Sequence, residues 1–178
     1  MSYMTQDEII ERKSNMFDHL LYEFEMYIFT FSRLSNLNPN HEDHALMKNV
    51  LIESHAVHLR NLIEFFNCDF GGINMKTIFS EPQDLSFDDT ALEAKKTVNR
   101  AIEHLTEERY KWSKSEKDLA IRAGMVIPTA YRDYIVPRIK ICISLLKRKD
   151  GVKQKHLDAL QDVDIQRRLT YLEQYLQS

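Results

Sequence analysis

Apolar residues follow helical spacing over the first part of the chain. Between residues 9 and 34 they recur at mixed steps of three and four, which places them on one wide face of a helix. Thr5 and Glu8 have the spacing of a capping box, in which each side chain satisfies a free N–H group at a helix start. The pattern therefore predicts a helix, which ends in a loop, 35–43, that contains Pro39 and three asparagines.

A second helix is predicted from about Asp43 to Phe66, where apolar residues again recur at helical spacing. The sequence NCDFGG ends it, because glycine readily adopts the left-handed conformation that closes many helices. The next stretch, 73–88, is irregular and contains a proline and several acidic residues. Its isolated aromatic residues, Phe79 and Phe87, are expected to hold this loop against the core.

The second half of the chain contains three further predicted helices before its last segment. A third helix spans 88–106 and is capped by one of two aspartates. Residues 115–122 form a short helix, and a longer one begins near Pro128 and runs to Leu146. Pro137 lies inside this longer pattern, where a proline either kinks the helix or marks its true start.

The last segment follows a basic turn, 147–155, that is centred on Gly151. Leucines at helical spacing predict a C-terminal helix over about 153–177, either packed on the bundle or used for self-association. Only four glycines and four prolines occur in 178 residues, which favours long helices with few tight turns. We therefore expect an all-α, up-and-down bundle of about five to six helices. It forms one domain, 1–178, with a core over about 5–149.

Composition and charge restrict the classes of function. The formal net charge is -3, so no overall basic field attracts nucleic acid. No apolar run reaches the ~18 residues that span a bilayer, and the N-terminus has no signal-peptide pattern. A cytoplasmic protein without membrane partners is expected. Cys68 and Cys142 lie in apolar surroundings, and we expect two buried thiols rather than a disulfide.

Polar residues capable of chemistry concentrate within one apolar stretch, IESHAVHLRNLIEFF. On a helix, His55, His58 and Asn61 are three residues apart and line one stripe. Arg60 and Glu64 are four apart and can pair along the neighbouring stripe. Such groups need partners if they are buried, because an unpaired one costs roughly 1–3 kcal/mol.

A later stretch, VNRAIEHLTEER, offers the expected partners. If the second and third helices pack antiparallel, His104 or Arg109 could face Arg60, Asn61 or Glu64 across the interface.

Three interpretations of these residues compete. A zinc site would use His55, His58 and His104, but the cysteines are isolated and no His-x-x-x-His or Glu-x-x-His pattern occurs. A metal-independent acid–base site would use His58 or His104 for proton transfer and Arg60 or Arg109 to hold a phosphate. A hydrogen-bond network that sets helix register is the interpretation we favour, and we expect neither metal nor cofactor.

The two stretches resemble the motifs of a group of small bacterial helical proteins that brings no settled activity with it. Their motifs are ES-x-x-x-H-x-RNLI-(D/E)-FF and N-K-x-I-x-HLT-x-x-R, and the likeness covers roughly residues 21–146. The first motif matches at Glu53, Ser54, His58, Arg60, Asn61, Leu62, Ile63, Glu64, Phe65 and Phe66. The second matches at Asn99, Ile102, His104, Leu105, Thr106 and Arg109, with Arg100 where lysine is usual.

A looser resemblance is to HEPN domains, the helical bundles of many toxin and defence nucleases. Their ribonuclease site is Arg-(Asn/Asp/His)-x-x-x-His, used without metal and generally at a dimer interface. Arg60 and Asn61 match its first two positions, but Phe65 stands where the histidine belongs. The second stretch, 100–104, is one residue too short and has alanine at its second position.

The function predicted from the sequence is that of a self-associating binding or interaction domain, expected as a homodimer. Its His/Arg/Asn cluster is structural or binds a ligand, with Asn61 and Glu64 as the ligand contacts. The alternative is a metal-independent ribonuclease of HEPN type or a toxin or defence component, with RNA as a partner that the net charge does not favour. In that case His58 or His104 is the acid–base group, and Arg60 or Arg109 holds phosphate.

Overall fold

The computed structural model describes residues 6–68, 73–81, 85 and 134–177. The α-helices in this part of the chain are α1 (Gln6–Ser35), α2 (His44–Asn67), α3 (Met75–Ile78), α7 (Val136–Arg148) and α8 (Val163–Gln177). Two short 3-10 turns, η2 (Gln154–His156) and η3 (Ala159–Gln161), join α7 to α8. The described residues form no strand beyond one isolated bridge. The predicted all-α class is confirmed.

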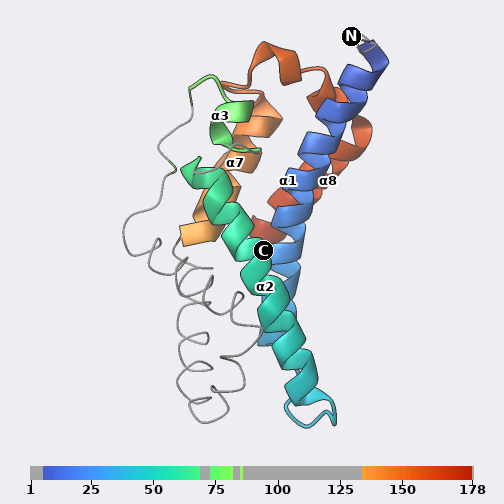
Figure 1. The fold of residues 1–178 in the computed structure, drawn as a ribbon, viewed down its shortest axis with the longest axis vertical. Helices are drawn as coiled ribbons and strands as arrows, with labels where there is room; N and C mark the ends of the chain where they lie inside the picture. The colour runs from blue at the N-terminus through green and yellow to red at the C-terminus, as the bar shows by residue number, and fades with distance from the viewer. Residues whose placement is uncertain (1–5, 69–72, 82–84, 86–133, 178) are drawn as a thin grey trace, which may run out of the picture.

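Helices α1 and α2 form an antiparallel pair, and α7 and α8 complete the bundle around them (Figure 1). Aromatic packing explains why α1 and α2 associate. Phe24 of α1 stacks on Phe66 of α2 with 6.4 Å between ring centroids, and it meets Phe65 edge-on. All three rings are buried, and burial of a phenylalanine side chain contributes about 1.5–3 kcal/mol.

The end of α2 lies where the sequence predicts it, but the residue that closes the helix is a different one. Cys68 adopts the left-handed conformation, with a φ of 59°. The glycines expected in this role, Gly71 and Gly72, lie outside the described residues.

The loop after α2 is attached to the basic turn that follows α7. Phe79 is 1% exposed and forms the isolated antiparallel bridge with Val152. The Ser80 N–H donates to the Gly151 carbonyl at 2.8 Å. The prediction that Phe79 anchors this loop is confirmed, whereas Phe87 lies outside the described residues.

Pro137 lies near the start of α7, which directly follows a π-helical turn at residues 134–135. Helix α7 begins at Val136, so the proline lies in its first turn, and the residues directly before 134, which would distinguish a kink from a start, lie outside the described residues. The expected helices at 88–106 and 115–122, and the start near Pro128, lie outside the described residues.

A C-terminal helix is present, but the start predicted for it, near residue 153, is wrong. Helix α8 begins ten residues later, at Val163, after the turns η2 and η3. The cause is the cap: the Asp162 carboxylate accepts from the N–H groups of Asp164, at 2.8 Å, and Ile165, at 3.3 Å. Helix α8 packs on the bundle through three buried side chains, Ile165, Leu169 and Leu172.

Both cysteines are free thiols. Cys142 is fully buried, which raises its pKa well above the usual range, while Cys68 is only half-buried. The expectation of two buried thiols therefore holds for Cys142 alone. Among the described helices, none is both long enough and apolar enough to cross a membrane.

Arg168 of α8 joins that helix to α1. Its guanidinium donates to both carboxylate oxygens of Glu25, at 2.8 and 2.9 Å, and to Asp18 at 2.9 Å. These bonds raise the pKa of the Arg168 side chain further above its ordinary value. A forked, two-oxygen contact of this kind is stronger than a single surface ion pair.

We expect Arg168→Ala to lower the free energy of unfolding by about 1–2 kcal/mol, because partial solvent exposure screens part of the interaction. Urea unfolding measures this loss. The control is Arg167→Ala, whose side chain is 76% exposed and which should change the free energy by less than about 0.5 kcal/mol. Equal losses in the two variants would contradict the role given to Arg168.

Candidate functional site

The stripe of polar residues predicted on α2 faces α1. His55, His58 and Asn61 all point at this helix, and each has a side-chain partner there. Thr30 is hydrogen-bonded to His55, while the Glu23 carboxylate accepts hydrogen bonds from both His58 and Asn61. The expected alignment of the three residues is confirmed, and the partners come from α1.

Glu23 is the centre of this arrangement. His58 Nδ1 lies 2.7 Å from its Oε2, and Asn61 Nδ2 donates to its Oε1 at 3.2 Å. Because an ionised carboxylate only accepts, the His58 hydrogen is on Nδ1. The ring of Tyr22 packs edge-on against His58, with 5.7 Å between centroids. His58 is 7% exposed, and a quarter of the Glu23 side chain, 24%, reaches solvent. We name Glu23, His58 and Asn61 the carboxylate triad.

His55 lies deeper, in an aromatic cage. Its ring stacks on Tyr27 at 4.4 Å and lies 5.9 Å from Phe31. Nδ1 lies 2.9 Å from the Thr30 hydroxyl, which also lies 2.7 Å from the Met26 carbonyl. A carbonyl only accepts, so the hydroxyl donates to Met26 and accepts from His55 Nδ1–H. Nε2 has no hydrogen-bond partner among the residues that the structure describes.

This environment keeps His55 neutral. Burial lowers the pKa of its imidazole from 6.5 to about 3, and the neighbouring His58 adds to the shift. A backbone contact with Tyr27 acts in the opposite direction. A side chain with this pKa does not exchange protons near neutral pH, so His55 supports structure rather than acid–base chemistry.

Arg60 and Glu64 are separate from the carboxylate triad. Arg60 Nε lies 3.8 Å from Glu64 Oε1, which confirms the predicted pairing four residues apart. The two side chains are 35% and 27% exposed. Partial exposure makes this a weak ion pair.

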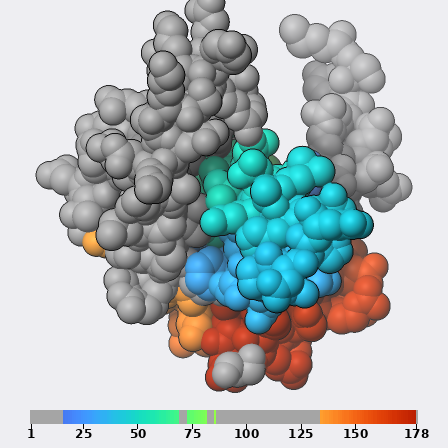
Figure 2. Space-filling model, turned by 90° about the horizontal axis from the view of Figure 1, so that it is seen from below, coloured from blue at the N-terminus to red at the C-terminus, as the bar shows by residue number. Residues whose placement is uncertain are grey.

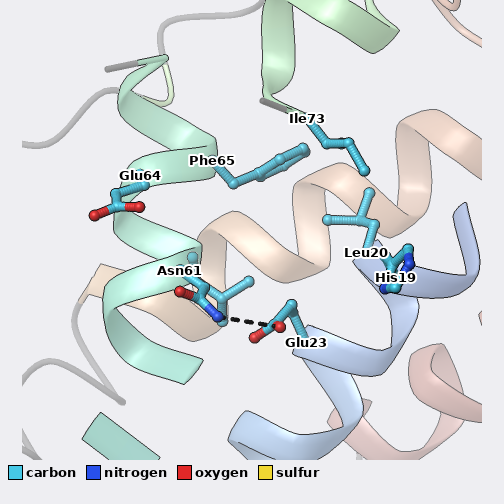
Figure 3. A pocket seen from close by; sticks show the side chains of 8 residues that line it. His19, Leu20, Glu23, Asn61, Glu64, Phe65 and Ile73 are labelled. Atoms are coloured by element: carbon cyan, nitrogen blue, oxygen red, sulfur yellow. Dashed lines mark hydrogen bonds between the residues drawn. The ribbon is translucent and has the colours of Figure 1, made fainter. Parts of the chain in front are cut away.

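A small pocket opens beside the carboxylate triad. Its volume is about 230 Å³, and it lies between α1, α2 and the start of the following loop. Figure 3 shows Glu23 and Asn61 joined at its edge, with Leu20, Phe65 and Ile73 supplying apolar surface. His19 and Glu64 also line it. The pocket thus combines apolar walls with a partly exposed carboxylate, Glu23.

The zinc interpretation gains no support from the described residues. They contain no group of three or more His, Cys, Asp or Glu side chains arranged to hold a metal ion. His55 and His58 each have Nδ1 engaged by a side chain of α1. The remaining candidates, His104 and Arg109, lie outside the described residues.

Sequence reasoning missed Glu23 and Thr30. Both belong to the apolar face of α1, where they are seven residues apart and share a stripe with Leu20 and Tyr27. A polar residue at such a position is a usable signal, because its burial requires a partner.

Comparison with protein-family models, with curated proteins and with solved structures finds no match to this chain. Functional inference therefore depends on the chemistry of the site itself.

We expect Glu23→Ala to lower the free energy of unfolding by about 1–3 kcal/mol, because it removes the acceptor of buried His58 and of half-buried Asn61. Arg60→Ala should lower the free energy of unfolding by less than about 1 kcal/mol, because the pair with Glu64 is long, at 3.8 Å, and partly exposed. Chemical denaturation compares the two, and a cycle with His58→Ala isolates the coupling between Glu23 and His58. A larger loss for Arg60→Ala would overturn this ranking.

His55 makes stability depend on pH. The pKa of His55 is 6.5 in the unfolded state and about 3 in the folded state. Between these two pH values the unfolded chain binds a proton on His55 and the folded chain does not. The free energy of unfolding should therefore fall as pH drops through this window, by up to about 1.4 kcal/mol per pH unit.

Denaturation of wild type and His55→Gln across this window measures the effect. In His55→Gln the free energy of unfolding should fall less steeply as the pH is lowered, because the variant has no imidazole to protonate at this position. Leu59→Ala, at an equally buried position, should lower the free energy by a constant amount and leave the slope unchanged. Equal slopes in wild type and His55→Gln would contradict a neutral, buried His55.

Proposed function

We propose that the chain is a binding domain whose pocket beside the carboxylate triad takes a small ligand with a positively charged or donor group. The observation that carries this proposal is the Glu23 carboxylate, which His58 and Asn61 hold in place at the pocket edge. A carboxylate has about four acceptor positions, so two contacts leave capacity for a ligand. Preorganisation of this kind lowers the cost of binding.

The dimensions of the pocket favour a small ligand. Its volume of about 230 Å³ is below the ~300–1,000 Å³ of typical drug-sized sites. Leu20, Leu62 and Phe65 supply an apolar wall for a hydrocarbon body. An aryl or alkyl amine combines both features, with its ammonium group on Glu23 and its hydrocarbon part on the wall.

The deeper part of the cluster has a different proposed role. His55 and Thr30 are fully enclosed, so they hold α1 and α2 in register and do not meet a ligand.

A metal-independent ribonuclease of HEPN type is less favoured. Glu23 and Glu64 give the pocket acidic character, which opposes a phosphate backbone. Arg60, a candidate for holding phosphate, pairs with Glu64. The hypothesis still requires His104 and Arg109, and loss of RNA cleavage in His58→Ala and His104→Ala would support it.

Benzylamine is a suitable probe, because it has an ammonium group on an apolar ring. We expect it to perturb backbone NMR signals of residues around the pocket, and benzyl alcohol to bind more weakly. Glu23→Gln should weaken benzylamine binding by about tenfold, since it removes the charge and keeps the shape.

The control is Glu42→Gln, which removes an exposed carboxylate before the start of α2. It should bind benzylamine like wild type. Circular dichroism confirms that each variant is folded at the temperature used. Equal affinity of wild type and Glu23→Gln, or of the amine and the alcohol, would refute the proposed site.

A further inference from the structure

A second and larger hollow lies on the other side of α1, against α8. Its volume is about 570 Å³. Met26, Phe29 and Arg33 line it from α1, and Tyr171, Leu172 and Tyr175 line it from α8. Figure 2 shows the C-terminal part of α1, in blue, at the surface between the start of α2 and α8. We name this hollow the aromatic groove.

The aromatic groove exposes three rings from two helices. Phe29 is 48% exposed, Tyr171 61% and Tyr175 40%. The centroids of the two tyrosine rings are 6.3 Å apart. Exposed aromatic faces around one hollow can stack on a planar ligand, and Met26 adds a polarisable thioether that also favours aromatic contacts.

The aromatic groove is lined by one cationic side chain, Arg33, and one carboxylate, Glu25. The Arg33 guanidinium lies over the Phe29 ring at 5.1 Å and makes no ion pair within the described residues. Glu25, the carboxylate that also lines the groove, has both oxygens bonded to Arg168. Arg33 is therefore the charged group that remains available to an anion.

The contact with the Phe29 ring holds this guanidinium beside the groove. Arg33 lines the groove, and the planar guanidinium matches the two oxygens of a carboxylate. The ring faces and the cation thus define two adjacent binding elements, one for a planar apolar body and one for an anionic group.

We propose that the aromatic groove binds a small aromatic carboxylate, with its ring system against Phe29 and Tyr171 and its carboxylate on Arg33. The volume of about 570 Å³ falls within the ~300–1,000 Å³ usual for small-molecule sites. The aromatic groove is proposed for an anionic ligand and the pocket beside Glu23 for a cationic one. The two proposals are therefore tested independently.

The test uses naphthalene carboxylate (naphthoate) as the probe and naphthalene methanol as its neutral counterpart. Isothermal titration calorimetry on the full chain should show that naphthoate binds more tightly than the alcohol. Arg33→Gln should weaken naphthoate by about tenfold and leave the alcohol unchanged. Tyr171→Ala should weaken both, because it removes stacking surface.

Arg167→Gln is the matched control, since Arg167 is an exposed arginine of α8 that does not line the groove. It should bind naphthoate like wild type. Equal naphthoate affinity in wild type and Arg33→Gln would overturn the proposal, as would equal affinity for the acid and the alcohol. Absence of naphthoate binding, together with a wild-type dimer that Tyr171→Ala dissociates in sedimentation, would show that a second copy covers the groove instead.

Discussion

The contacts of one half-buried carboxylate with two side chains of the facing helix determine how α1 and α2 fit together. Glu23 of α1 is hydrogen-bonded to both His58 and Asn61 of α2. Thr30 and His55 form a second contact between the same two helices. Apolar faces tolerate a shift of one turn, since hydrophobic contact has no direction. A shift of α1 against α2 would strand several polar groups at once, each at a cost of roughly 1–3 kcal/mol. These contacts therefore select a single register.

The helices could be predicted because their apolar positions recur at a clear period, as in α1 and α2. The error at the C-terminal helix has a physical cause. Leu157, Leu160 and Val163 are three residues apart, a spacing that suits a 3-10 turn as well as an α-helix. The Asp162 cap decides where α8 begins.

Only the α2 residues of the candidate site could be predicted from the sequence, and their partners on α1 could not. His58 and Asn61 were identifiable because polar residues within an apolar stretch need partners. Glu23 could not be assigned as that partner, because acidic residues are common on helices and only the packing of α1 on α2 shows which one is enclosed. The aromatic groove likewise depends on side chains that are more than 130 residues apart in sequence, such as Arg33 and Tyr171.

The hydrogen positions on the two histidines test the central claim most directly. A nitrogen–proton correlation spectrum of the imidazole rings at neutral pH reports which ring nitrogens carry hydrogen. The account predicts that Nδ1 of His58 is protonated toward Glu23, and that His55 is neutral with its hydrogen on Nδ1 toward Thr30. A charged His55, or hydrogen on Nε2 alone in either ring, would contradict it.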